Sequence, residues 1–304
     1  LAESDAVRFQ ALATHTREVD NLALVPDSAF NAMTFSEDLY TAGLDGESFL
    51  GHAFFAGIGR NTSTYSIGAD YSELSPTFRA DNGFEPQNDQ RMGSLNAVYV
   101  MRFEKSPTFE YVSLSANAAR KWNFDGVQKD EWITPNLEVQ SRIASTGMHF
   151  NYLASNELFR GIQFNGIWGA HACFSTTPMD ALRLSGNVNY GHRIARFDLV
   201  MGKQLDYGLT ATLKPIDRLV ISATFGRSES DDVDTGEELF SQSIFWSRLS
   251  LQLSRELSVR LVSQYNDRWK TWEVDPLLTY RINPLSMFYV GSTHDYREFA
   301  AAGD

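Results

Sequence analysis

The sequence predicts an all-β fold, specifically a transmembrane up-and-down antiparallel β-barrel of about 14–18 strands. Three observations predict it. Apolar and polar residues alternate along most of the chain, many alternating segments are long, and the connections between them are by turns short and long. The 304 residues are expected to form one domain, with residues 1–47 following the pattern less clearly than the rest.

Alternation is clearest in LRLSGNVNYG, residues 182–191. Every second residue from Leu182 to Tyr190 is apolar or small, and the residues between them are polar. Residues 207–214 and 219–226 repeat this pattern. Because successive side chains of a strand point to opposite faces, these segments predict strands with one apolar and one polar face. The apolar face then needs either a protein core or lipid against it.

Strands are expected along almost the whole chain, separated by turn-forming residues. Residues 6–16 and 31–41 open the series, with a short or distorted strand at residues 22–25. No segment of comparable length carries the 3.6-residue apolar stripe of a helix. At the far end, either residues 296–299 begin an abbreviated closing strand or the closing strand is missing. Between these ends the expected strands are residues 48–60, 63–74, 91–103, 109–122, 131–143, 148–154, 162–174, 182–192, 207–214, 219–226, 239–253, 257–265, 271–282 and 287–292.

Strand length and connections favour a membrane barrel over a soluble β-sandwich or propeller. Many segments reach about ten residues, whereas soluble strands average about 5–6 and a tilted membrane-crossing strand needs about 9–11. Every second connection is expected to be short, such as residues 61–62 and 215–218, and the others longer, such as residues 75–90 and 227–238. Outer-membrane barrels have short periplasmic turns and longer outer loops in this way.

Composition excludes several classes of protein. A net charge of −12 and a pI of about 5.0 argue against nucleic-acid binding, which needs a basic surface. No stretch approaches the ~18 consecutive apolar residues of a transmembrane helix. The acidic run at residues 229–238 is expected to be a solvated loop. A single cysteine, Cys173, excludes an internal disulfide and is expected to be a buried strand residue.

Catalytic and metal-binding motifs are not found. The six histidines show no metal-binding spacing, so no metal site and no cofactor are expected. His149, Asn151 and Ser155 share one face of an expected strand and raise the alternative of an outer-membrane lipid hydrolase. Within one strand, however, Ser155 would lie about 20 Å from His149 at ~3.3 Å per residue, and catalysis needs about 3 Å. The chain is therefore not expected to be an enzyme.

Two stretches resemble a known family. The first is DYSELSPTFRADNGFEPQNDQR, residues 70–91, and the second is LVSQYN, residues 261–266, followed by LLTYRINPLSMFYVG, residues 277–291. They resemble the C-terminal barrel of a family catalogued as a domain of unknown function, in which the barrel usually follows a carbohydrate-binding-like domain of the family-nine type. Thr77 and Gln87 depart from the family pattern. The resemblance implies an integral outer-membrane protein of a Gram-negative bacterium.

The leading functional expectation is a porin-like channel or transporter, whose polar side chains line a lumen. The alternative is a plugged barrel that anchors or scaffolds a partner protein or a surface assembly. Expected partners are membrane lipids, lipopolysaccharide and small solutes, with a partner protein in the alternative and no nucleic acid. Residues 75–90 are expected to form a constriction or a docking loop. The lumen-lining candidates are Arg183, Asn187, Asn189, Thr210, Thr212, Lys214, Arg260, Gln264, Glu273 and Arg281, and the loop candidates are Phe78, Arg79, Asn82, Phe84 and Pro86.

Overall fold

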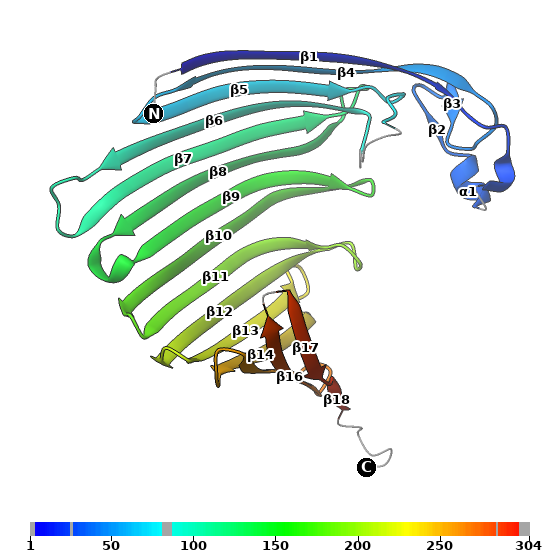
Figure 1. The fold of residues 1–304 in the computed structure, drawn as a ribbon. Coiled ribbons are helices and arrows are strands. Elements are labelled where there is room, and N and C mark those ends of the chain that lie inside the picture. The colour runs from blue at the N-terminus through cyan, green and yellow to red at the C-terminus, as the bar shows by residue number, and fades with distance from the viewer. Residues whose placement is uncertain (1–3, 25–26, 81–86, 284, 298–304) are drawn as a thin grey trace. The chain divides into compact units, whose positions relative to one another are not determined.

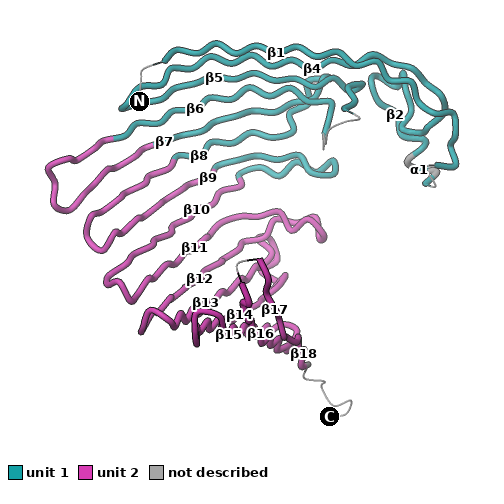
Figure 2. Tube along the Cα trace, viewed as in Figure 1, with its two compact units in different colours: residues 1–100, 115–135, 154–166 teal, residues 101–114, 136–153, 167–304 magenta. Residues whose placement is uncertain are grey.

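A computed structural model describes residues 4–24, 27–80, 87–283 and 285–297. The chain is 74% strand and 3% helix, so the predicted all-β class is confirmed. Among the described residues, no helix has the length and apolar character needed to cross a membrane. The chain divides into two compact units (Figure 2). Unit 1 comprises residues 1–100, 115–135 and 154–166, and unit 2 comprises residues 101–114, 136–153 and 167–304.

One antiparallel sheet of 16 strands contains nearly all of the regular structure. From β4 to β17, strands that follow one another in the chain pair with one another, which confirms the up-and-down topology (Figure 1), while β1 pairs with β4 and β18 pairs with β16. The described pairings do not join the two ends of this order, so closure into a barrel stays a prediction. The strands of the sheet are β1 (Ser4–Arg17), β4 (Ser48–Asn61), β5 (Tyr65–Leu74), β6 (Gln90–Arg102), β7 (Phe109–Trp122), β8 (Gln128–Ser141), β9 (Gly147–Phe159), β10 (Ile162–Met179), β11 (Leu182–Ala195), β12 (Val200–Ile216), β13 (Leu219–Asp232), β14 (Glu238–Gln252), β15 (Leu257–Asn266), β16 (Thr271–Asn283), β17 (Ser286–Gly291) and β18 (His294–Arg297).

Every segment expected between residues 48 and 292 is a strand, and several strands are longer than expected. β10 has 18 residues and β12 has 17. The predicted alternation of short and long connections is therefore wrong for most of the chain: apart from residues 18–47 between β1 and β4 and residues 75–89 between β5 and β6, the connections between the strands of the sheet are two to six residues long. The connections are shorter than predicted because the strands continue through polar segments, whose backbones also pair. Lys203, for example, lies opposite Asp231.

The acidic run at residues 229–238 is not a loop throughout. Its first part belongs to β13, and Asp232 closes the turn that follows by accepting the N–H groups of Asp234 and Thr235, both at 2.8 Å. Cys173 lies in β10 as expected, but it is half-buried rather than buried. At the chain's end, β18 pairs with β16, and residues 298–299 of the abbreviated closing strand lie outside the described residues, so a closing strand stays a prediction.

Residues 31–41 do not form the predicted strand. They begin at the end of a short helix, α1 (Ser28–Asn31), where the Asp27 carboxylate accepts the Ala29 N–H at 2.9 Å. A hairpin of β2 (Thr34–Phe35) and β3 (Tyr40–Thr41) follows. Its turn places three non-glycine residues in the left-handed region, including Asp38 with a φ of 63°, which ends a strand. The expected strand at residues 22–25 is a 3₁₀ turn, η1 (Leu22–Leu24), and Val25 lies outside the described residues.

Candidate functional site

β11 to β16 of unit 2 present a polar face, which we define as the side of these strands on which Thr212 lies. Residues directly opposite one another in an antiparallel pair point to the same side of the sheet. Arg183 lies opposite Thr212, which in turn lies opposite Ser222 on β13. Ser222 lies opposite Arg248 of β14, so one row of side chains continues across four strands. The remaining strands extend it through the β14–β15 and β15–β16 registers.

Register and strand alternation bring every predicted lumen residue to this one face. The residues come from β11 (Arg183, Asn187, Asn189), β12 (Thr210, Thr212, Lys214), β15 (Arg260, Gln264) and β16 (Glu273, Arg281). Residues that the sequence analysis did not single out, such as Asp206 and Arg248, share the face. The structure thus gathers the predicted set, and its role in lining a lumen stays a prediction.

Hydroxyl and amide groups bond to one another across the polar face. The side-chain oxygens of Thr210 and Thr224 lie 2.9 Å apart, and those of Thr212 and Ser222 lie 3.1 Å apart. Further along, the Asp206 carboxylate accepts a hydrogen bond from Gln204 at 2.8 Å. Because these groups satisfy one another, the face stays polar while its side chains are held in fixed positions.

Arginine residues gather at one end of the polar face. A hollow of about 370 Å³ lies next to the turn at residues 217–218 and is lined by Arg218, Arg248 and Arg260, with Asp217 as the only carboxylate of its described lining. Ser250 accepts a hydrogen bond from Nε of Arg248 at 3.2 Å. Three guanidinium groups around one hollow make a locally positive site in a chain whose net charge is −12.

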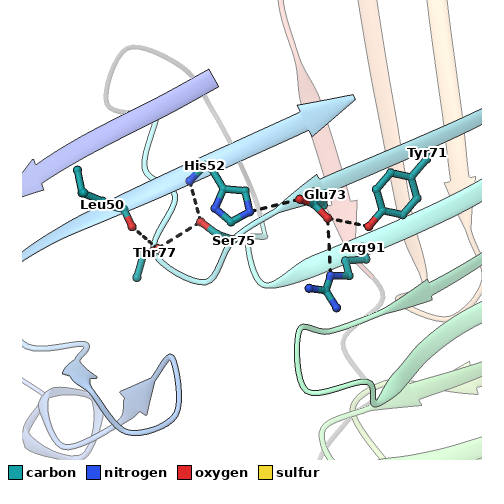
Figure 3. A network of polar contacts seen from close by, with 7 residues as sticks. All are labelled: Leu50, His52, Tyr71, Glu73, Ser75, Thr77 and Arg91. Atoms are coloured by element: carbon teal, nitrogen blue, oxygen red, sulfur yellow. Dashed lines mark hydrogen bonds and ion pairs between the residues drawn. The ribbon is translucent and has the colours of Figure 1, made fainter. Parts of the chain in front are cut away.

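In unit 1, the first part of the connection at residues 75–89 is fixed to β4 (Figure 3). Ser75 donates its N–H to the His52 carbonyl at 2.9 Å, and its hydroxyl oxygen accepts the His52 N–H at 2.9 Å. Thr77 donates its hydroxyl to the Leu50 carbonyl at 2.7 Å. Phe78 is only 7% exposed. The ring of Phe78 is therefore packed, and it is not available to line a constriction or to dock a partner.

Charged and aromatic side chains make further contacts beside this segment. The Glu73 carboxylate lies between three groups, at 3.3 Å from Nε2 of His52, 3.7 Å from Nε of Arg91 and 2.7 Å from the Tyr71 hydroxyl that donates to it (Figure 3). Arg79, the second predicted loop residue, places its guanidinium 5.0 Å and 5.1 Å from the ring centres of Phe35 and Phe49. The other three predicted loop residues, Asn82, Phe84 and Pro86, lie outside the described residues.

Within the part of the chain that the structure describes, two groups of side chains could hold a metal ion, although no metal site was expected from the sequence. The first is His149, His171 and Cys173 in unit 2. The second is Glu18, Asp45 and Glu47 in unit 1, an acidic group in which burial and the neighbouring Glu47 carboxylate raise the pKa of Glu18. The first group could not be recognised from the sequence because His149 and His171 are 22 positions apart, and no local spacing reveals the pair.

Comparison with protein-family models finds no match, and comparison with curated proteins finds none either. The resemblance to the barrel of a domain of unknown function stays a prediction from residues 70–91, 261–266 and 277–291.

Proposed function

We propose that the chain is an integral outer-membrane β-barrel whose polar face lines a passage for small solutes. The observation that supports this most directly is the apolar face, which we define as the opposite side of β11 to β16. Val188, Leu209 and Leu213 lie on it and are 41%, 54% and 43% exposed. A sheet with one polar and one apolar exposed face is suited to water on one side and hydrocarbon on the other.

The small number of buried apolar side chains among the described residues supports the same proposal. Among the described residues, the buried apolar side chains are Phe49, Phe78, Ala119, Phe164 and Ile167. A soluble sandwich or propeller of this length would bury the apolar faces of its strands against a second layer. In lipid, exposed leucine, valine and aromatic side chains on one face stabilise the protein instead.

The proposal requires the sheet to close. An open strand edge within hydrocarbon leaves N–H and C=O groups without partners, and each such group costs several kcal/mol. A closed barrel of about 16 strands has an interior wide enough for an aqueous channel. The arginine-lined hollow then favours negatively charged solutes, because fixed positive charge raises the local concentration of anions.

Planar lipid bilayers test the proposal. The full chain, folded in detergent and added to one side, is expected to give discrete conductance steps, and a heat-unfolded sample of the same preparation serves as the control. A protein that inserts, shifts in unboiled electrophoresis and yet passes no current would overturn the passage and favour the plugged anchor. A chain that stays soluble and monomeric without detergent would overturn the membrane location itself.

A further inference from the structure

We propose that His149, His171 and Cys173 bind one transition-metal ion, with Zn²⁺ as the ion to be tested. His149 lies on β9, and His171 and Cys173 lie two residues apart on β10, so both point to the same side of that strand. One ligand atom from each of the three side chains lies within 4.8 Å of the other two. The rings of His149 and His171 have their centres 5.8 Å apart.

The distances suit an ion after small side-chain movements. Zn²⁺ bonds to imidazole nitrogen at about 2.0–2.1 Å and to thiolate sulfur at about 2.3 Å. Tetrahedral angles then separate the ligand atoms by roughly 3.3–3.8 Å, so rotations that move each atom by about an ångström complete the arrangement. All three side chains are half-buried, which leaves a path for an ion from solvent.

Asn189 orients one of the ligands. Its side-chain oxygen lies 2.6 Å from Nδ1 of His171, from the position directly opposite on β11. A carboxamide oxygen only accepts, so this contact places the proton of His171 on Nδ1 and leaves the lone pair on Nε2. Histidine ligands of metal sites are commonly fixed by such a hydrogen bond through the other ring nitrogen.

Room for a fourth ligand lies beside His171. A hollow of about 140 Å³ is lined by Asn151, His171, Asn189, Gln204 and Asp206, among others. The hollow is large enough for a water molecule, which needs a cavity of only about 10–15 Å³ and polar partners. A site of two imidazoles, one thiolate and a water prefers Zn²⁺, Co²⁺, Ni²⁺ or copper to Mg²⁺ or Ca²⁺, which take oxygen ligands.

The proposal does not depend on the proposed passage, because the cluster needs only the register of β9 to β11. Binding would link β9 to β10 across the sheet. Since an ion that binds only the folded state stabilises it, Zn²⁺ is expected to raise the thermal midpoint of the protein.

Metal titration of the full chain in detergent micelles, after removal of metal by a chelator, tests the site. Isothermal titration is expected to show one equivalent of Zn²⁺, and Mg²⁺ at the same concentration is expected to give no heat. Co²⁺ in place of Zn²⁺ is expected to give a thiolate-to-cobalt absorption band in the wild type, which Cys173→Ser removes. Asn189→Ala is expected to weaken Zn²⁺ binding about 10–100-fold, and His171→Ala by at least as much.

His294→Gln is the matched control, because His294 lies in the same unit, outside the cluster and outside the lining of the hollow. It is expected to bind Zn²⁺ as the wild type does. The proposal is overturned if the wild type shows neither stoichiometric Zn²⁺ binding nor the cobalt–thiolate band. It is also overturned if His294→Gln weakens binding as much as His171→Ala, since the ion would then be held elsewhere. The wild-type cobalt spectrum decides the question even if a variant fails to fold.

Discussion

Gly51 and Phe78 approach each other so closely that a side chain on Gly51 would meet the backbone. A Cβ built at Gly51 would lie 2.4 Å from Cα of Phe78 and 2.5 Å from the Thr77 carbonyl oxygen. Glycine at this position lets residues 77–78 pack closely on β4, and the hydrogen bonds of Ser75 and Thr77 then hold them there.

Gly51→Ala is therefore expected to displace the segment around Phe78 and to destabilise the protein by about 1–3 kcal/mol, the usual cost of overpacking. The measurement is the denaturant midpoint in detergent, together with protease cleavage at residues 75–89. Gly226→Ala on β13 is the control, because a Cβ there meets no atom within 4 Å. Equal effects of the two substitutions would contradict the close packing of Gly51 on Phe78.

Arg248→Glu combined with Arg260→Glu is expected to shift ion selectivity from anions toward cations. The two substitutions turn two of the three positive charges of the hollow into negative ones. The measurement is the reversal potential across a bilayer with a salt gradient. Arg268→Glu, in the turn between β15 and β16, is the matched charge reversal away from the hollow. An unchanged reversal potential in the double variant would show that the hollow does not face the conducting path.

A comparison of Leu209→Arg with Thr210→Arg tests whether lipid or protein covers the apolar face. The two residues are neighbours on β12 and point to opposite sides of the sheet. In a membrane, Leu209→Arg is expected to cost about 2–4 kcal/mol near the bilayer centre, and Thr210→Arg to cost less because its charge reaches water. The measurement is unfolding by denaturant from lipid vesicles. A larger loss for Thr210→Arg would contradict the assignment of the two faces.

Glu18→Gln is expected to make unit 1 more stable at neutral pH. The pKa of Glu18 is raised above 4.5 by burial and then by the Glu47 carboxylate, with Arg79 acting in the opposite direction. The folded state therefore binds the proton more tightly than the unfolded state, so stability falls as pH rises through the raised pKa. The gain from Glu18→Gln is expected at pH values above that pKa and to vanish below 4.5.

Thermal midpoints measured in detergent across the acidic and neutral range check this dependence. Glu104→Gln, an exposed carboxylate in the connection between β6 and β7, is the control and is expected to change the profile little. A gain for Glu18→Gln that is the same at every pH would rule out the carboxylate's charge as its cause.

Much of the fold could be read from local pattern, because the two-residue period of a strand is present in any short stretch. Residues 182–192 and 219–226 were placed correctly in this way. Residues 31–41 were not, because left-handed backbone at Ser36 to Asp38 is set by turn geometry that alternation does not reveal. The long connections were also overestimated, because polar residues such as Lys203 and Asp231 pair as well as apolar ones do.

The sequence by itself determined the fold class, the order of the strands and which side chains of one strand share a face, since each follows from neighbours along the chain. Only the tertiary structure decided which residues of different strands and connections contact one another. The register between β10 and β11 places Asn189 against His171, and the path of residues 75–79 places Phe78 over Gly51. These contacts join residues far apart in the sequence, and a shift of one residue in register would turn every side chain of a strand to the other face.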